Sequence, residues 1–203
     1  RAYATNYLGT SYGPNITFTT LTTPTVSATA TISSISGTTA TTGGTITVDG
    51  GATVTSRGLV WGTTSGASTY SVTSGTGTGT YTSSLTGLTP ATTYYVRSFA
   101  TNSVGTVYGT ETSFTTNAIA PTLTTTAASS ITKYAASAGG TITSNGGSAI
   151  TVSGICWSTT ATPTISDSKT TDGTTSGTFT SSLTSLTAGT TYYVRAYATN
   201  AIG

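Results

Sequence analysis

The sequence has no histidine, no methionine, one cysteine and very few charges. Charged residues make up 5% of the chain, with six Lys or Arg and four Asp or Glu, so the formal net charge is +2. The four acids are scattered at Asp49, Glu111, Asp167 and Asp172. Enzymes of most classes need clustered acid, base or nucleophile side chains. We therefore expect no enzyme activity, no catalytic residue, no cofactor and no resident metal.

Other missing features exclude further classes. A cluster of basic residues, the electrostatic signature of nucleic-acid binding, is absent. The longest apolar runs, such as residues 58–61, are far shorter than the roughly 20 residues of a membrane-spanning helix. Low Lys with abundant Thr, Ser and Gly is typical of exported proteins, so we expect an extracellular or cell-surface location. No signal peptide opens the sequence, and Arg1 is interpreted as an internal start.

The residues that are present favour β-structure. Hydrophobic residues make up 34% of the chain, including 12 Tyr and many β-branched side chains, and these residue types favour strands over disorder. Residues 93–101 alternate strictly, which is typical of a half-buried strand. The sequence predicts inward-facing Tyr94, Val96, Ser98 and Ala100, outward-facing Tyr95, Arg97, Phe99 and Thr101, and almost no helix.

The chain is a tandem repeat. RAYATN at residues 1–6 returns as RSFATN at 97–102 and as RAYATN at 195–200, at offsets of 96 and 98. A unit of this length matches an immunoglobulin-like sandwich of about 100 residues, whereas solenoid repeats run to about 20–50. We expect residues 1–20 to be the last strands of a preceding unit, 21–117 a complete unit, and 118–203 a unit without its last strand. The longer second offset predicts an inserted loop between Trp157 and Phe179.

Residues 88–105 carry the pattern Leu-x-Pro-x-Thr-x-Tyr followed by Ala-x-Asn-x-x-Gly, and residues 186–203 repeat it with Ala188 in place of the proline. This pattern resembles the signature of fibronectin type III domains. The resemblance implies tandem antiparallel sandwiches in which Tyr94 and Tyr192 are structural tyrosine-corner residues. Together with GICWS, TSSLT and SYG before FTT, it is similar to fibronectin-like repeats in large exported proteins of the Bacteroidota, where they form stalks of surface adhesins and spacers of secreted enzymes.

Two groups of side chains are candidates for surface contacts. One is an outward strip that could stack on sugar rings or stiffen the sheet by cross-strand pairing: Tyr95, Arg97 and Phe99 in the first unit, and Tyr193, Arg195 and Tyr197 in the second. The other is the pair Trp61 and Trp157. If Val54, Gly58 and Val60 face inward, the tryptophans join an exposed patch; if Leu59 faces inward, they belong to the core.

Three smaller signals have ordinary interpretations beside functional ones. Asp167 and Asp172 in one loop could offer calcium two carboxylates, but Lys169 lies between them and a solvated turn is the simpler interpretation. The sequon at Asn15 falls in a predicted strand. Cys156 aligns with Val60, so both are interpreted as small core hydrophobes.

The sequence therefore predicts a structural extracellular module of a stalk, filament or adhesin shaft. The alternatives are a carbohydrate-binding module, with glycans as partners, or spacer domains of a secreted enzyme. Residues 8–20 correspond to residues 104–116, which close the complete unit. They either belong to a longer covalent chain of repeats, which is the simpler account, or complete the last unit of a neighbouring copy by strand addition.

Overall fold

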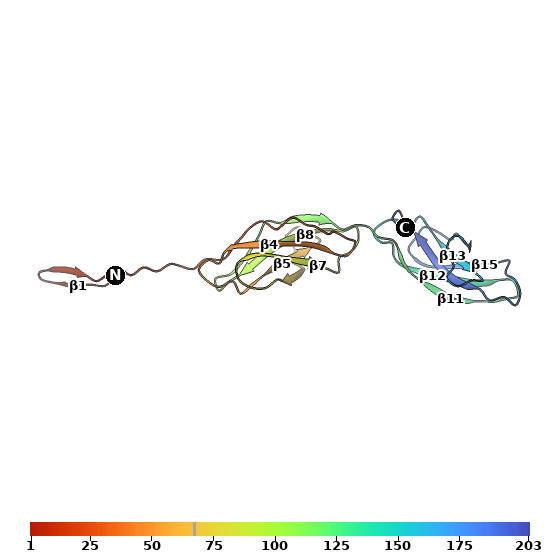
Figure 1. The fold of residues 1–203 in the computed structure, drawn as a ribbon, viewed down its shortest axis with the longest axis horizontal. Helices are drawn as coiled ribbons and strands as arrows, with labels where there is room; N and C mark the ends of the chain where they lie inside the picture. Colours follow the sequence, from red (N-terminus) through yellow and green to blue (C-terminus); the bar gives the residue numbers. More distant parts are fainter. Residues whose placement is uncertain (67) are drawn as a thin grey trace.

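A hairpin and two β-sandwiches follow one another along the chain (Figure 1) in a computed structural model that describes residues 1–66 and 68–203. The hairpin consists of β1 (Tyr3–Asn6) and β2 (Gly9–Tyr12), paired antiparallel. Residues 13–20 then run as extended chain to the first sandwich. Apart from the half-buried Gly13, every side chain in residues 1–20 is exposed.

The first sandwich packs a three-stranded sheet on a larger one. The smaller sheet has the order β3-β4-β7, and the larger has the order β10-β8-β5-β6 with β9 also on β8. The strands are β3 (Thr25–Val26), β4 (Ala40–Val48), β5 (Ser56–Gly62), β6 (Tyr70–Thr73), β7 (Gly79–Leu85), β8 (Thr93–Thr101), β9 (Thr106–Tyr108) and β10 (Thr112–Thr115). Leu59, Leu85 and Val96 are fully buried between the sheets.

The second sandwich repeats this plan with fewer strands. Its sheets have the orders β11-β12-β15 and β14-β13-β16. The strands are β11 (Thr122–Ser129), β12 (Ala136–Ser144), β13 (Val152–Ser158), β14 (Ser168–Lys169), β15 (Gly177–Leu183) and β16 (Tyr193–Thr199). The buried core is smaller and contains Ala138, Ile155, Leu183 and Ala196. Within the part of the chain that the structure describes, β16 pairs only with β13.

The predicted fold class is confirmed: each unit is an antiparallel β-sandwich, and the described residues contain no helix. Accordingly, no helix among them is long and apolar enough to cross a membrane. The predicted alternation in β8 is also correct, because Tyr94, Val96, Ser98 and Ala100 are buried. The insertion lies in the loop between β13, which ends at Ser158, and β14, which begins at Ser168.

A short joint links the sandwiches. The backbone N–H of Asn117 donates to the Ser36 carbonyl (3.0 Å), and its amide Nδ2 donates to the Ile35 carbonyl (2.9 Å). Two residues later, the N–H of Ile119 donates to the Gly146 carbonyl (2.8 Å) of the second sandwich. Ala118 is therefore the one residue between an anchor on the first sandwich and an anchor on the second.

Candidate functional site

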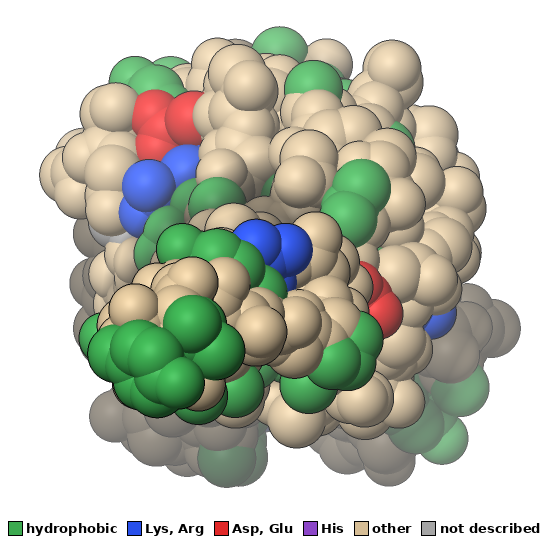
Figure 2. Space-filling model, turned by 90° about the vertical axis from the view of Figure 1, so that its left-hand side faces the viewer, with side chains coloured by type: hydrophobic (Ala, Val, Ile, Leu, Met, Phe, Trp, Pro, Cys, Tyr) green, Lys and Arg blue, Asp and Glu red, His purple; other side chains and the backbone are tan. Residues whose placement is uncertain are grey.

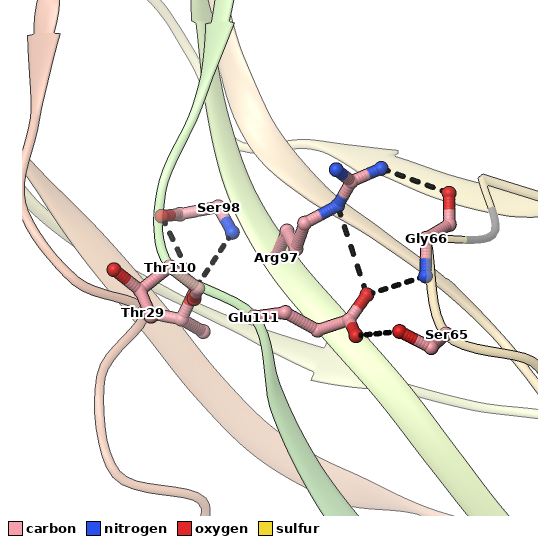
Figure 3. A network of polar contacts seen from close by, with 7 residues as sticks. All are labelled: Thr29, Ser65, Gly66, Arg97, Ser98, Thr110 and Glu111. Carbon is pink, nitrogen blue, oxygen red and sulfur yellow. Dashed lines mark hydrogen bonds and ion pairs between the residues drawn. The ribbon is translucent and has the colours of Figure 1, made fainter.

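The outward face of β8 carries a polar network around Arg97 (Figure 3). The Arg97 guanidinium donates to the Gly66 carbonyl (3.0 Å) and lies 4.0 Å from the Glu111 carboxylate. Glu111 in turn accepts the Ser65 hydroxyl (2.6 Å) and the Gly66 N–H (2.7 Å). The hydrogen bond from Ser65, then that from Gly66, lowers the pKa of Glu111 below its ordinary value. The network ties the loop after β5 to the chain just before β10.

The side chains of the predicted outward strip lie together on the first sandwich, but they are partly buried. Tyr95, Arg97 and Phe99 are all half-buried. The Tyr108 ring lies 6.5 Å from the Phe99 ring and 4.6 Å from the Arg97 guanidinium carbon. These contacts leave little aromatic face open for a planar ligand.

The corresponding strip of the second sandwich is more open. Tyr193 is 47% exposed, and Arg195 is exposed as well. Tyr197 is half-buried because its hydroxyl donates to the Thr170 carbonyl (2.6 Å).

The two tryptophans belong to the interior. Trp61 is 7% exposed and packs in the first core with Leu59 and Val54, stacked on Tyr70 with ring centroids 5.8 Å apart. Trp157 is half-buried against the second core. Of the two alternatives for Trp61, the structure supports the core and not the exposed patch, because Leu59 and Trp61 face the opposite sheet. Val60, on the other face of β5, is buried too.

The expectation that Asp167 and Asp172 share one loop is wrong, because β14 lies between them. Asp167 accepts the Thr164 N–H (2.8 Å), whereas Asp172 accepts the hydroxyls of Thr170 (2.8 Å) and Ser181. No group of three or more His, Cys, Asp or Glu side chains suited to a metal occurs among the described residues.

The structure differs from two further sequence predictions, those for Cys156 and for Asn15. Cys156 is 1% exposed but lies outside the core between the sheets, with its thiol against the carbonyls of Pro163 and Arg195. Burial raises the pKa of this thiol. The expectation of a strand at Asn15 is wrong, because residues 13–20 form no strand in the described chain.

The two tyrosine hydroxyls face backbone five residues upstream. Tyr94 accepts the Thr89 N–H (3.0 Å) and Tyr192 accepts the Thr187 N–H (3.1 Å). The second hydrogen bond lowers the pKa of Tyr192. The rings differ in environment: Tyr94 is 4% exposed and stacks on Phe114, whereas Tyr192 is only half-buried.

An open groove lies beside Tyr192. It has a volume of about 470 Å³ and lies against the start of β16. It is lined by apolar side chains together with Thr residues and Lys133; the aliphatic residues are Ala128, Ile131, Ala136, Leu183, Leu186, Ala188 and Val194. Concave apolar surfaces with a few polar groups at the rim are typical binding sites.

Two asparagines hold the ends of the sandwiches. Asn102 donates its amide to the carbonyls of Thr22 (2.7 Å) and Asp49 (2.8 Å). Asn200 makes the same contacts with Ile119 (2.7 Å) and Asn145 (2.8 Å). The repeated Asn-x-x-Gly pattern was the sequence signal for these residues, but it did not reveal that Asn200 holds Ile119 next to the joint.

Comparisons with known proteins add limited information. No protein-family model matches the chain, and no curated protein matches it. Among solved structures, the FN1-FN3 domains of chicken CNTN1 are similar, with a TM-score of 0.49 and 15% identity over 89% of this chain and 62% of that one. The chain thus spans less than two thirds of that structure. The fold class continues to rest on the strand order described above.

Proposed function

We propose that this chain is a structural module of an extracellular stalk, filament or adhesin shaft, in which tandem sandwiches hold another part of the assembly away from a cell. The observation that carries this proposal is the short joint. Because Asn117 is hydrogen-bonded to the first sandwich and Ile119 to the second, the linker has almost no free length. A spacer keeps its length only if the linkers between its domains do not bend freely, and a linker without free length meets this need.

Close backbone packing supports the same role. Gly147 of the second sandwich has φ +82°, and a Cβ added to it would lie 2.5 Å from the Cβ of Ala91 in the first. Gly37 of the first sandwich likewise packs closely against Ile119. Any side chain at these glycines would push the units apart, so the sequence itself is adapted to the contact.

The test is a measurement of relative motion between the sandwiches. Residual dipolar couplings of the weakly aligned full chain should fit one alignment tensor for both sandwiches. Asn117→Ala removes the amide contact with Ile35 and should give two different tensors, while the control Asn15→Ala, at an exposed position, should leave a single tensor. Different tensors in the unmodified chain would contradict the proposed spacer.

A carbohydrate-binding module is the second candidate, because Tyr193 and Arg195 are exposed on one face of β16 and aromatic rings with guanidinium groups suit sugar recognition. A glycan array decides it. A reproducible hit that Tyr193→Ala abolishes and Tyr134→Ala retains would favour this candidate, since Tyr134 is a comparably exposed tyrosine elsewhere on the same unit. Spacer domains of a secreted enzyme would share the joint, and a neighbouring catalytic domain in the gene product would identify them.

A further inference from the structure

One residue of the joint contacts both sandwiches. The backbone of Ile119 is bound to the second sandwich, because its N–H donates to the Gly146 carbonyl (2.8 Å) and its carbonyl accepts the side-chain amide of Asn200 (2.7 Å). Its side chain is half-buried and lies against Gly37 of the first sandwich. The second sandwich therefore holds Ile119 in place while the side chain packs on the first.

Gly37 leaves the space that this side chain occupies. Gly37 is buried, and a Cβ added to it would clash with Cγ2 of Ile119. Its φ lies outside the left-handed region, so the backbone conformation does not require glycine at this position. The close approach of Ile119 is what requires a residue without a side chain here.

The equivalent turn of the second sandwich carries a long side chain. Residues 36–39 in the first sandwich and residues 132–135 in the second each form a turn closed by a backbone hydrogen bond of 2.8 Å. The second residue of the turn is Gly37 in the first sandwich and Lys133 in the second. The same turn thus forms with either residue type, and only the first of the two leaves room for a neighbour.

The linker into the first sandwich has the same backbone contacts and a different side chain. Thr22, the equivalent of Ile119, donates its N–H to the Gly50 carbonyl (2.9 Å) and accepts the side-chain amide of Asn102 (2.7 Å). The hold on the linker backbone is therefore common to both repeats. What differs between the two linkers is the side chain at this position.

We propose that Gly37 and Ile119 are a matched pair that determines which sandwich can follow the first. The partner that fits the surface at Gly37 is a sandwich entered through a linker with a branched apolar residue at the position of Ile119. A side chain such as that of Lys133 would fill the space that this residue needs, so the two sandwiches are not interchangeable in the chain. The proposal rests on the proposed spacer function and names the neighbour that its joint accepts.

A double-mutant cycle on the full chain tests the pair. Gly37→Ala adds a Cβ that clashes with Cγ2 of Ile119, and Ile119→Ala removes Cγ2, so each single variant should give two alignment tensors in the dipolar-coupling measurement. In the double variant the new Cβ would lie 3.6 Å from the Cβ that remains at residue 119, which is ordinary van der Waals contact. The Asn117 carbonyl oxygen, 3.2 Å from the new Cβ, needs only a small shift. The double variant should therefore return to a single tensor, a non-additive result expected of residues in contact.

Matched controls make the same kinds of change at other positions. Gly173→Ala adds a Cβ with no atom within 4 Å, and Thr22→Ala shortens the side chain of the other linker, so both should keep a single tensor. Ile119→Val retains Cγ2 and should also keep it. Gly37→Lys should give two tensors, whereas the reverse change Lys133→Gly should leave one. Native chemical shifts in both cores of every variant would show that the sandwiches remain folded.

Two results would overturn the matched pair. A single tensor in either single alanine variant would mean that the joint does not need this contact, and two tensors in the double variant would mean that the residues act independently. Either result leaves the spacer intact as long as the unmodified chain gives one tensor. Two tensors in the unmodified chain would contradict the spacer instead. Nuclear Overhauser effects between the Ile119 methyl groups and the Gly37 α protons would then decide on the pair, since their presence supports the contact and their absence overturns it.

Discussion

At the scale of single residues, the hydroxyl of Tyr94 has one clear function, which is to hold the Thr89 backbone. Tyr94→Phe should lower the free energy of unfolding of the first sandwich by about 1 kcal/mol, the net value of one hydrogen bond. Tyr193→Phe is the matched control because its ring is 47% exposed. A urea transition unchanged by Tyr94→Phe would remove the tyrosine corner from this account.

Glu111 gives the first sandwich a pH dependence with a defined sign. Its pKa is lower in the folded chain than the ordinary 4.5, chiefly through the Ser65 hydroxyl. The stabilisation is therefore present above the unfolded-state pKa and is lost as the pH falls through the folded pKa. Glu111→Gln should be less stable than the unmodified chain at neutral pH and equally stable in acid. Urea titrations at both pH values measure this, and a constant difference would contradict it.

At the scale of strands, Phe114 and Phe18 are the same residue type in two environments. Phe114 is 8% exposed in the core, and Phe18 is 89% exposed beside no sheet. In dilute solution Phe114→Ala should destabilise the first sandwich by about 3–5 kcal/mol, whereas Phe18→Ala should change stability by less than about 0.5 kcal/mol. Thermal unfolding compares the two. A large loss from Phe18→Ala in a dilute monomer would mean that the segment already packs in its own molecule.

Strand positions could be predicted because each repeat preserves its alternation, and β8 follows the prediction residue by residue. The environment of Tyr192 could not be predicted as easily. Its sequence pattern matches that of Tyr94, but burial of the ring depends on a strand contributed from elsewhere in the chain or by another chain. Trp61 illustrates a second limit. Because β5 carries apolar residues on both faces, its sequence does not show which face points into the core.

At the scale of the whole molecule, the N-terminal end contrasts with the sandwiches. Figure 2, which faces this end, shows hydrophobic side chains gathered in front and few charged ones. Tyr3, Tyr7, Leu8 and Tyr12 are all more than half exposed. Residues 1–20 would show this exposure if they are the last strands of a preceding unit, as the repeat predicts.

The joint was the feature least visible in the sequence. Residues 117–120 before Pro121 are one residue longer than the equivalent residues 21–23 before Pro24. Nothing in the local pattern of Asn117 predicts hydrogen bonds to both Ile35 and Ser36. Such contacts depend on loops brought together by the folded sandwiches. The repeat could therefore be recognised from the sequence, whereas the hydrogen bonds at the joint required the structure.

The central claim, an extracellular structural shaft, is tested most directly by immunogold electron microscopy of intact cells that produce this protein, with antibodies raised against the purified chain. The account predicts gold particles in rows along thin fibres that project from the cell surface. Labelling confined to the cell interior would contradict it.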